Sequence, residues 1–378
     1  EPALNHAFVA AVSVLLIACP CAMGLATPTA ILVASGRGAG LGLLFRQGAA
    51  LETLARVDTV VFDKTGTLTE GRPTLTELMA FGPDENAALT LAASVEQHSE
   101  HPLGTAIVAA ARARGLSLSE ADEVEARPGL GIRARVDGRM VVVGARRWME
   151  ELGVDLEPTA AGEGPANSTA TLMHVAVDGK LVAVLGVSDP IKPGSREAIG
   201  RLAEQGLDVA LLTGDGRPTA ESVARELGIG RVLAEVMPAD KSAEIARLQA
   251  EGRRVAFVGD GINAAPALAQ ADVGIAIGTG TDIAIESGSV VLMRGDPRGV
   301  ADAVELARRT LRTIRLNFVW AYGYNVALIP LAAGVFWPFT GWQLDPMFAA
   351  GAMSLSSLFV VTNSLRLRTA LSDRSHRS

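Results

Sequence analysis

The sequence contains very little cysteine: its 378 residues include only Cys19 and Cys21. Two cysteines separated by a single residue are too close for a relaxed disulfide, so we expect no disulfide framework. Proteins of reducing compartments lack such frameworks. The part of the chain outside any membrane is therefore expected to be cytosolic.

Charged residues make up only 20% of the chain and hydrophobic residues 49%, which is too apolar for an ordinary soluble enzyme. Residues 8–36 carry no charge, and Asp345 is the only charged residue between positions 316 and 365. The first stretch is long enough for one membrane span and the second for two, whereas a signal peptide would be shorter and would begin with basic residues. Arginines follow the first stretch and flank the second, which indicates a cytoplasmic side.

Two further features are absent. The net charge is −7, and no stretch combines basic residues with interleaved aromatic ones, so we expect no nucleic-acid partner. The Gly-x-x-x-x-Gly-Lys-Ser/Thr motif also does not occur, so the chain does not hold ATP by a P-loop.

Several apolar runs end in small or polar residues, as parallel strands do where their carboxyl ends meet a crevice. These runs are Val57–Phe62 before Asp63, Leu207–Leu212 before Thr213-Gly214-Asp215, Arg254–Val258 before Gly259-Asp260, and Val273–Ile277 before Gly278. Helical patterns lie between most of them. The sequence therefore predicts an α/β fold with a doubly wound parallel sheet, whose polar strand ends converge on one crevice.

A segment of different character interrupts this pattern. Alternating runs around Asp137-Gly138 and around Asp178-Gly179 predict two β-hairpins, because Asp-Gly favours tight turns. We therefore expect an antiparallel α+β insert. The predicted domains are 1–56 (membrane helix and linker), 57–75 (α/β domain, first part), 76–185 (insert), 186–305 (α/β domain, second part) and 306–378 (two membrane helices and a tail).

The first uncharged stretch contains Cys19-Pro20-Cys21. A proline inside a helix removes one backbone hydrogen bond and kinks the helix, and two thiols beside the kink can face the break. Small, apolar-like cysteines can also simply pack between membrane helices. Ligating groups at a broken helix in a membrane usually mark an ion pathway, and we favour that interpretation.

Three motifs make the chain similar to the heavy-metal P-type ATPases. Residues 63–69, Asp-Lys-Thr-Gly-Thr-Leu-Thr, match the phosphorylation motif of the P-type ATPases. Cys-Pro-Cys matches the metal-site signature of the heavy-metal members, and Ser99–Leu103 resembles their nucleotide-domain motif. From the Cys-Pro-Cys span to the last two spans, the chain resembles the carboxy-terminal part of the copper(I) subgroup.

This resemblance implies a haloacid dehalogenase-like doubly wound parallel sheet, an inserted α+β nucleotide-binding domain and three transmembrane helices. The α/β domain would then be the phosphorylation domain. The implied activity is ATP-driven translocation of Cu(I) through an aspartyl phosphate, with ATP and Mg²⁺ as cofactors. The implied location is a bacterial plasma membrane, with the catalytic domains on the cytoplasmic side.

The resemblance also assigns roles to residues. Asp63 is the candidate nucleophile that takes the γ-phosphoryl group, Lys241 would neutralise part of its charge, and Thr213 would hydrogen-bond its oxygens. The implied catalytic set is Asp63, Lys64, Thr65, Thr213, Gly214, Asp215, Lys241, Asp260 and Asn263, with Asp63, Thr65 and Asp260 at Mg²⁺. The residues implied for the nucleotide are Glu96, His101, Gly129 and Gly131.

The transported ion is inferred from ligand types. Soft sulfur ligands favour Cu(I), whereas Zn²⁺ is well served by a carboxylate or imidazole, which the predicted spans lack. The tyrosine-asparagine pair of one late span and the methionine and serines of the other also follow the copper(I) pattern. The predicted site consists of Cys19, Cys21, Tyr324, Asn325, Met353 and Ser357.

Two departures from the family pattern matter. The family has an aspartate where this chain has Ala264, so we expect weaker organisation of Mg²⁺ and slower phosphorylation. The actuator domain and the preceding spans are also missing from this sequence, which begins with Glu1 rather than methionine, so we expect a part of a longer protein that neither transports nor dephosphorylates rapidly alone. The expected partners are membrane lipid, the copper ion, a copper chaperone and those missing parts.

Two alternatives remain open. A membrane-anchored haloacid dehalogenase-type phosphatase would carry an aspartate as general acid where this chain has Thr65, so that residue disfavours it. A non-catalytic metal-binding membrane module with a degenerate ATPase domain is compatible with Ala264. The former would hydrolyse small phosphoesters without metal stimulation, and the latter would bind Cu(I) without becoming phosphorylated.

Overall fold

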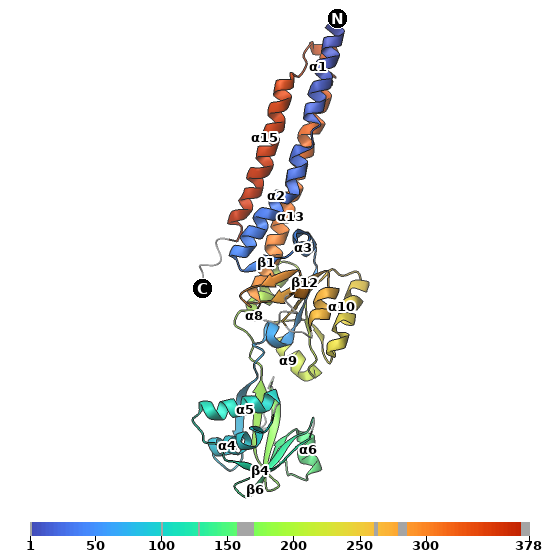
Figure 1. Ribbon diagram of the computed structural model, residues 1–378. Coiled ribbons are helices and arrows are strands. Elements are labelled where there is room, and N and C mark those ends of the chain that lie inside the picture. The colour runs from blue at the N-terminus through green and yellow to red at the C-terminus, as the bar shows by residue number, and fades with distance from the viewer. Residues whose placement is uncertain are drawn as a thin grey trace. The chain divides into compact units, whose positions relative to one another are not determined.

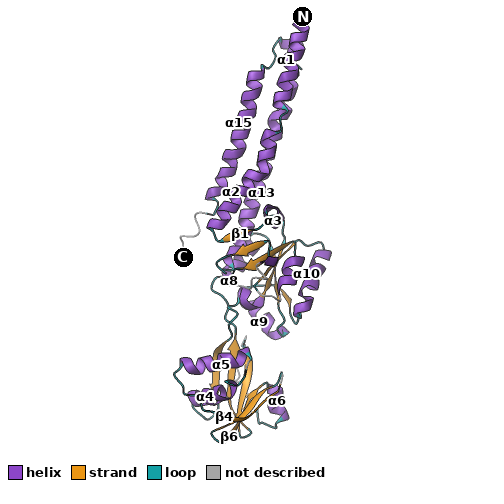
Figure 2. Cartoon of the chain, viewed as in Figure 1, coloured by secondary structure: helices purple, strands orange, loops and turns teal. Residues whose placement is uncertain are grey.

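The computed structural model describes residues 2–99, 101–127, 129–156, 170–260, 264–278 and 286–371. The chain divides into two compact units. The first contains Glu1–Val60, Arg201–Asp208 and Ser242–Ser378, and the second contains Val61–Gly200 and Val209–Lys241. Figure 1 labels the elements, and Figure 2 shows long helices in purple and the strands of two sheets in orange.

Four helices of the first unit pack along one another (Figure 1). They are α1 (Pro2–Ile17), α2 (Cys21–Gly40), α13 (Arg298–Ala332) and α15 (Pro346–Leu365). Helix α2 buries Ala22, Ala26, Ala30 and Ala34, one residue per turn, against α13 and α15. Small side chains at this spacing let helix backbones approach closely, as they do in membrane proteins.

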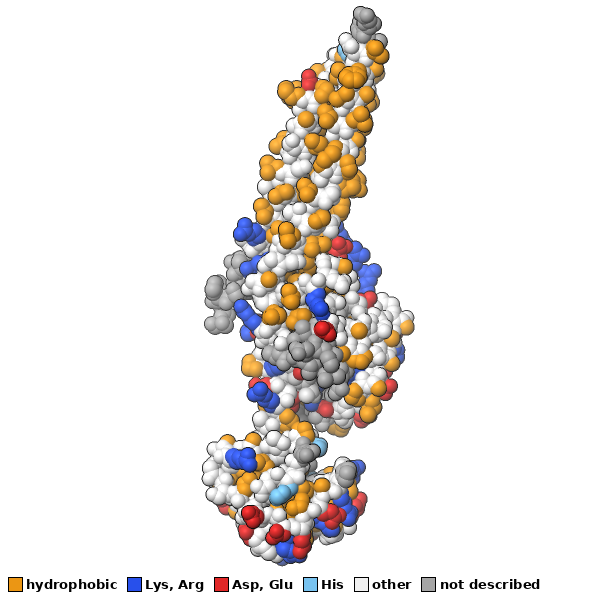
Figure 3. All heavy atoms as spheres, viewed as in Figure 1, with side chains coloured by type: hydrophobic (Ala, Val, Ile, Leu, Met, Phe, Trp, Pro, Cys, Tyr) orange, Lys and Arg blue, Asp and Glu red, His pale blue; other side chains and the backbone are white. Residues whose placement is uncertain are grey.

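Apolar side chains cover the visible surface of this helical part in Figure 3. Among the described residues, two helical stretches are long and apolar enough to cross a membrane: Leu4–Gly40 and Pro346–Thr369. Two of the three predicted spans are thereby recovered. The third falls in the carboxy-terminal half of α13, where Asn317, Tyr324 and Asn325 lower the mean hydropathy.

The first sheet has seven strands in the order β1-β13-β12-β11-β2-β9-β10. Their bounds are β1 (Leu43–Phe45), β2 (Thr59–Asp63), β9 (Asp208–Leu212), β10 (Arg231–Leu233), β11 (Val255–Gly259), β12 (Val273–Ile277) and β13 (Val290–Leu292). The pairs β9–β10, β11–β12 and β12–β13 are parallel, whereas β1 joins β13 antiparallel. All residues of β2, β11 and β12 are buried, as expected for parallel strands covered on both faces.

The four strands expected from the sequence are present, and the first ends at Asp63 itself. The helices associated with this sheet are α3 (Gly48–Leu54), α8 (Ser195–Glu204), α9 (Arg217–Leu227), α10 (Lys241–Ala250) and α11 (Ala265–Gln270). A short helix, α14 (Trp337–Thr340), lies between α13 and α15 in the chain. The predicted α/β fold is confirmed.

The second sheet has six antiparallel strands in the order β3-β8-β7-β6-β5-β4. Its elements are β3 (Thr74–Ala80), α4 (Glu85–Glu96), α5 (Pro102–Ala113), β4 (Ala121–Arg127), β5 (Gly131–Val136), β6 (Arg139–Gly144), α6 (Arg146–Glu151), β7 (Thr171–Val177) and β8 (Lys180–Ser188). Both predicted hairpins form. Their turn residues have positive φ, 47° and 76° at Asp137 and Gly138, as a type I′ turn requires.

Alternation along the strands builds a core on each face of this sheet. Val141 and Val143 of β6 pack with helices α4 and α5 on one face. Val142, between them, packs on the other face against Trp148 and Met149 of α6. Because successive side chains of a strand point to opposite faces of the sheet, one layer of helices packs on each face.

Candidate functional site

Asp63 is a buried carboxylate at the carboxyl end of β2, 7% exposed. Its Oδ2 accepts from Lys241 Nζ at 2.6 Å, and its Oδ1 accepts from the backbone N–H of Lys64 at 2.8 Å. Lys241 begins α10 and is equally buried. The two residues lie far apart in the sequence, so the fold brings them together.

Burial raises the pKa of Asp63 above its ordinary value, because water no longer solvates the charge. The Lys241 ammonium and the Lys64 N–H favour the carboxylate and offset part of the rise. A nucleophile must be ionised to attack. The local geometry therefore makes the reactivity of Asp63 depend on positive charge around it.

Other predicted residues surround this pair. Lys64 forms an ion pair with Asp215, which follows β9. Thr213 is buried, and its Oγ1 accepts from the Asp215 N–H at 3.1 Å. The polar ends of β2 and β9 thus meet, as predicted. Gly214 lies between Thr213 and Asp215 and approaches the Val236 carbonyl, to which an added Cβ would come within 3.3 Å.

The loop after Asp63 is held by side chains of the segment that connects β8 to α8. Thr69 Oγ1 donates to Asp189 Oδ2 at 2.5 Å, Lys192 Nζ donates to the Gly66 carbonyl, and Ser195 Oγ donates to the Leu68 carbonyl at 2.8 Å. Gly66 has φ of 73°, which favours glycine. Sequence reasoning missed these three supporting side chains, although the charged residues around Pro190 could have indicated them.

The same loop exposes one predicted residue and buries a missed one. Thr65 is exposed to solvent, whereas Thr67 is fully buried and its Oγ1 has no hydrogen-bond partner among the residues that the structure describes. A buried hydroxyl without a partner is costly, so this atom fits an incoming polar group.

The third of the predicted polar strand ends follows β11, in the first unit. Asp260 follows β11 and is half-buried, while Asn263 lies outside the described residues. Ala264 is fully buried and precedes α11 with no side-chain cap. The relation of Asp260 to Asp63 remains a prediction.

All four residues predicted for the nucleotide line one cavity of about 360 Å³ on the six-stranded sheet: Glu96, His101, Gly129 and Gly131. Residues that sequence reasoning missed complete the lining, among them Gly104, Arg127, Gly144, Thr171 and Met173. The cavity lies between the ends of α4 and α5 and the strands β4–β7.

Glu96 is the most perturbed group of this cavity. It is 2% exposed at the end of α4, and burial raises its pKa to about 7, although a hydrogen bond from Ser99 opposes the rise. Gly104 lies directly against it, since an added Cβ would sit 2.2 Å from Glu96 Oε2. The Glu96 carboxyl is therefore fixed in place, and near neutral pH its protonated and ionised forms are both populated.

His101 and Gly131 also have structural roles. His101 is the N-cap of α5, where its Nδ1 accepts from the Leu103 N–H at 3.2 Å. Gly131 has φ of 147°, and an added Cβ would lie 2.2 Å from the Val143 carbonyl oxygen of the paired strand. Its glycine is thus required by strand packing, whether or not a ligand approaches.

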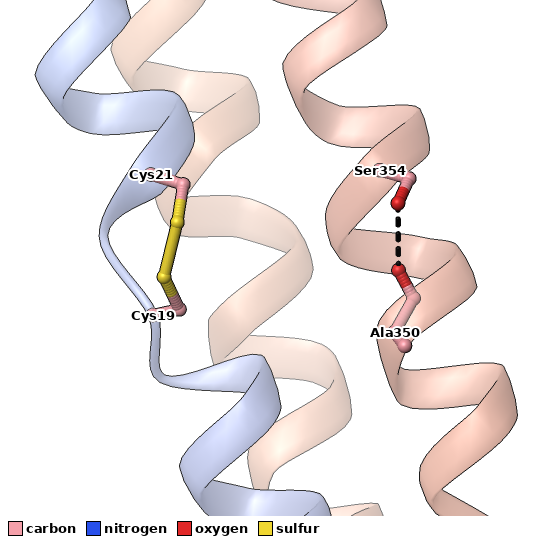
Figure 4. Close-up of a disulfide and its surroundings, with 4 residues drawn as sticks. All are labelled: Cys19, Cys21, Ala350 and Ser354. Carbon is pink, nitrogen blue, oxygen red and sulfur yellow. Dashed lines mark hydrogen bonds between the residues drawn. A yellow bond between two sulfur atoms is a disulfide. The ribbon is translucent and has the colours of Figure 1, made fainter.

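The two cysteines lie in the break between α1, which ends at Ile17, and α2, which starts at Cys21. The structure joins Cys19 and Cys21 in a disulfide with a Cα–Cα distance of 5.5 Å (Figure 4). From the sequence we expected neither a relaxed disulfide nor a disulfide framework, and this single bond between near neighbours makes no such framework. Figure 4 also shows Ser354 on the neighbouring helix α15, which contacts both α1 and α2.

The other predicted ligands lie on α13 and α15: Tyr324, Asn325, Met353 and Ser357. Tyr324 packs in the apolar cluster of Ile17 and Ala332, at the end of α1. Three buried polar atoms here make no hydrogen bond of good geometry among the described residues: Tyr324 Oη, Asn325 Oδ1 and Ser356 Oγ. Tyr324 nevertheless lies close to both Asn325 and Ser356. Such atoms are costly among apolar helices, so they fit a bound polar group. The sequence prediction chose Ser357 and missed its buried neighbour Ser356, although both follow Met353 at helical spacing.

Comparisons with known proteins agree with this geometry. A model of the haloacid dehalogenase-like hydrolases matches residues 57–272. The chain is 53% identical over 371 residues to "Copper-transporting ATPase 1" of Rhizobium meliloti, covering 98% of this chain and 45% of that protein. It is 51% identical over 369 residues to "Copper-exporting P-type ATPase" of Legionella pneumophila, covering 97% of this chain and 50% of that one. The chain thus spans about half the length of these relatives.

A solved structure also resembles it. A zinc-transporting PIB-type ATPase in the E2.Pi state superposes with a TM-score of 0.82 at 35% identity. The match covers 94% of this chain and 57% of that one. The two comparisons therefore agree on the architecture and name different metals for the related proteins.

Glu96 generates a pH-dependent prediction. Its carboxyl has an ordinary pKa of 4.5 and a folded pKa of about 7, so the folded state favours the protonated form. The resulting stability is complete below pH 4.5 and is lost as the pH rises through 7. We expect this group alone to remove about 3 kcal/mol between pH 5 and pH 9.

Thermal unfolding of the full chain at the two pH values measures this loss. Glu96→Gln should remove most of the difference, while Glu85→Gln, on the exposed face of the same helix, should not. If the unfolding temperatures of the wild type and Glu96→Gln changed with pH by the same amount, Glu96 would be ionised at neutral pH.

Proposed function

The chain belongs to the haloacid dehalogenase-like hydrolases and to the P-type ATPases among them, and from this we propose that it carries the phosphorylation, nucleotide-binding and ion-binding parts of a Cu(I)-translocating pump. The single observation that best supports the proposal is the buried Asp63–Lys241 pair at the end of β2. A surface carboxylate would be solvated by water. The Asp63 carboxylate is instead buried, accepts hydrogen bonds from Lys241 and from the Lys64 N–H, and lies next to a second lysine, Lys64, which pairs with Asp215.

Phosphoryl transfer follows from this arrangement. An Asp63 carboxylate oxygen attacks the γ-phosphorus of ATP, the bond to the β–γ bridging oxygen breaks, and ADP leaves. Lys241 already contacts Asp63, so it is positioned to balance charge on the transferring group. Thr65 offers no acid to assist hydrolysis, so the aspartyl phosphate persists long enough for a conformational step.

Mg²⁺ is proposed at oxygen atoms of Asp63, Thr65 and Asp260, which are the hard ligands that this ion prefers. Its charge would lower the pKa of Asp63 and favour the carboxylate, in opposition to burial. Lys64, Thr213, Gly214, Asp215 and Asn263 are proposed to complete the catalytic set.

The nucleotide is proposed to bind in the cavity of Glu96, His101, Gly129 and Gly131. The lining is mainly apolar and glycine-rich, with polar side chains from Glu96, Ser99, His101, Arg127 and Thr171, as is typical of a ligand pocket. The domain boundaries given above remain part of this proposal.

The transported ion is proposed to be Cu(I), bound by Cys19, Cys21, Tyr324, Asn325, Met353 and Ser357. The reduced cysteines would provide thiolates and Met353 a thioether, the soft donors that Cu(I) prefers. The described parts of α1, α2, α13 and α15 contain no Asp, Glu or His deep within their uncharged stretches, since His6 and Asp345 lie at the ends near Gln343. Because the similar solved structure is a zinc-transporting ATPase, Zn²⁺ is the competing ion in the binding test.

The proposed setting is a membrane crossed by these helices, with both sheets in the cytoplasm. A copper chaperone is a proposed donor of the ion, and an actuator domain and further spans are proposed to act with this chain. Ala264 favours one alternative, a metal-binding module that is not phosphorylated, because a buried methyl group stands where the family has a carboxylate.

Asp63→Asn should abolish phosphoenzyme formation, since an amide cannot act as the nucleophile. We expect at least a ~100-fold loss of acid-stable, hydroxylamine-sensitive label from ATP, measured with and without Cu(I). Asp122→Asn, on an exposed strand, should retain wild-type labelling. Label that persists on the Asp63 variant would place the phosphoryl group elsewhere.

Ala264→Asp should restore the family carboxylate near Asp260 and raise the phosphorylation rate by about tenfold at limiting Mg²⁺. Raised Mg²⁺ should give the unmodified chain part of the same gain. Because Ala264 is fully buried, the variant's thermal stability must be measured alongside. Equal rates and equal Mg²⁺ dependence in a stable variant would make this departure neutral.

Metal titration of the membrane-embedded chain under reducing conditions tests the ion. Cys19→Ala and Met353→Ala should each weaken Cu(I) binding by at least about tenfold, since each removes one of few ligands. Met347→Ala, on the exposed side of α15, is the matched control. Stoichiometric Zn²⁺ binding that displaces Cu(I) would overturn the assignment.

A further inference from the structure

A second polar pocket lies in the first unit, away from the cysteines. It has a volume of about 380 Å³ and is formed by the segment 201–205 and by helix α13. Four arginines line it: Arg201, Arg308, Arg309 and Arg312. On α13 the lining positions recur every three or four residues, so they share one face of the helix.

The charges of this pocket are only partly balanced. Arg201 pairs with Asp302 at 2.5 Å and Arg309 pairs with Glu305 at 2.6 Å. Arg308 donates to a neutral group, the Gln205 carbonyl, at 2.6 Å. Arg312 is exposed and has no partner among the described residues.

One acid on the lining remains unpaired. Glu204 is exposed and has no ion-pair partner in the described part of the chain. Arg308 and Arg312 therefore leave two positive charges and Glu204 one negative charge. This balance suits a singly charged anion better than a doubly charged one.

The position of the pocket along α13 indicates where the anion comes from. The uncharged stretch starts at Leu316, four residues after Arg312, which is about 6 Å along a helix. The polar headgroup layer of a bilayer is about 5–8 Å deep on each side, so Arg312 lies at headgroup depth if Leu316 enters the hydrocarbon. Arg315, also exposed, continues the basic face toward the membrane. Figure 3 shows Lys and Arg side chains gathered at the lower end of the apolar helical part.

We propose that this pocket binds a phosphate-bearing anion and that its source is the phosphodiester headgroup of an anionic lipid. Guanidinium groups bind phosphate oxygens through paired hydrogen bonds, and basic pockets beside membrane helices bind anionic headgroups. A phosphodiester carries one negative charge, which matches the unbalanced charge, whereas inorganic phosphate near neutral pH is a mixture of monoanion and dianion. The site involves neither the cysteines nor Asp63, so it does not depend on the transported ion.

The test uses the full chain in neutral detergent, with bound dihexanoyl phosphatidylglycerol counted by native mass spectrometry. Dihexanoyl phosphatidylcholine, whose cationic choline cancels the charge, and inorganic phosphate are the comparison probes. Arg312→Gln should weaken phosphatidylglycerol binding by about fivefold, since one arginine near a headgroup contributes about 1 kcal/mol. Arg312 is exposed and has no partner within the described ranges of the chain, so the variant should fold normally.

Two further variants sharpen the result. Glu204→Gln should tighten phosphatidylglycerol binding by a similar factor, because it removes the opposing charge. Arg139→Gln, at an exposed position on β6, is the matched control and should change nothing. Phosphate that competes at millimolar concentration, with the same response to the variants, would support the site with a free anion as its source. Phosphatidylglycerol binding that neither pocket variant alters, or that phosphatidylcholine equals, would overturn the proposal.

Discussion

The buried ion pair between Asp63 and Lys241 is the interaction on which the rest of the site depends. Burial raises the pKa of Asp63, and the Lys241 ammonium opposes that rise and favours the carboxylate, the form that the proposed nucleophile requires. The lysine comes from α10, far from Asp63 in the sequence, so this contact depends on the tertiary fold. The crossing segment that carries Asp189, Lys192 and Ser195 fixes the loop after Asp63, so the connection to the insert also supports the site.

The insert shows how one residue can serve both fold and ligand. Gly131 is needed because the neighbouring strand leaves no room for a Cβ, and His101 begins a helix. Glu96 has the opposite character: its burial weakens the fold as the pH rises, and the hydrogen bond from Ser99 offsets only part of that cost. A destabilising acid inside a cavity is better evidence of ligand binding than a glycine that packing already explains.

The contacts between the long helices are of two kinds: closely packed small side chains and buried polar groups. Alanines on α2 bring the backbones together, while Tyr324, Asn325 and Ser356 place buried polar atoms close to one another, without a hydrogen bond of good geometry in the described part of the chain. The first feature stabilises the bundle, and the second costs stability unless something polar binds. The arginines at the start of α13's apolar stretch add a third requirement, an anion at the membrane surface.

The sequence by itself determined the local features: the strand ending at Asp63, the two Asp-Gly hairpins, the helix break at Pro20 and the α/β fold class. These follow from backbone preferences and side-chain periodicity over a few residues. The family motifs already placed Lys241 with Asp63, and the tertiary structure added their direct contact. Only the tertiary structure showed that Asp189 and Lys192 support the loop after Asp63 and that Ser356 is the buried serine. Contacts between distant segments are set by how the whole chain packs, and no local pattern encodes that packing.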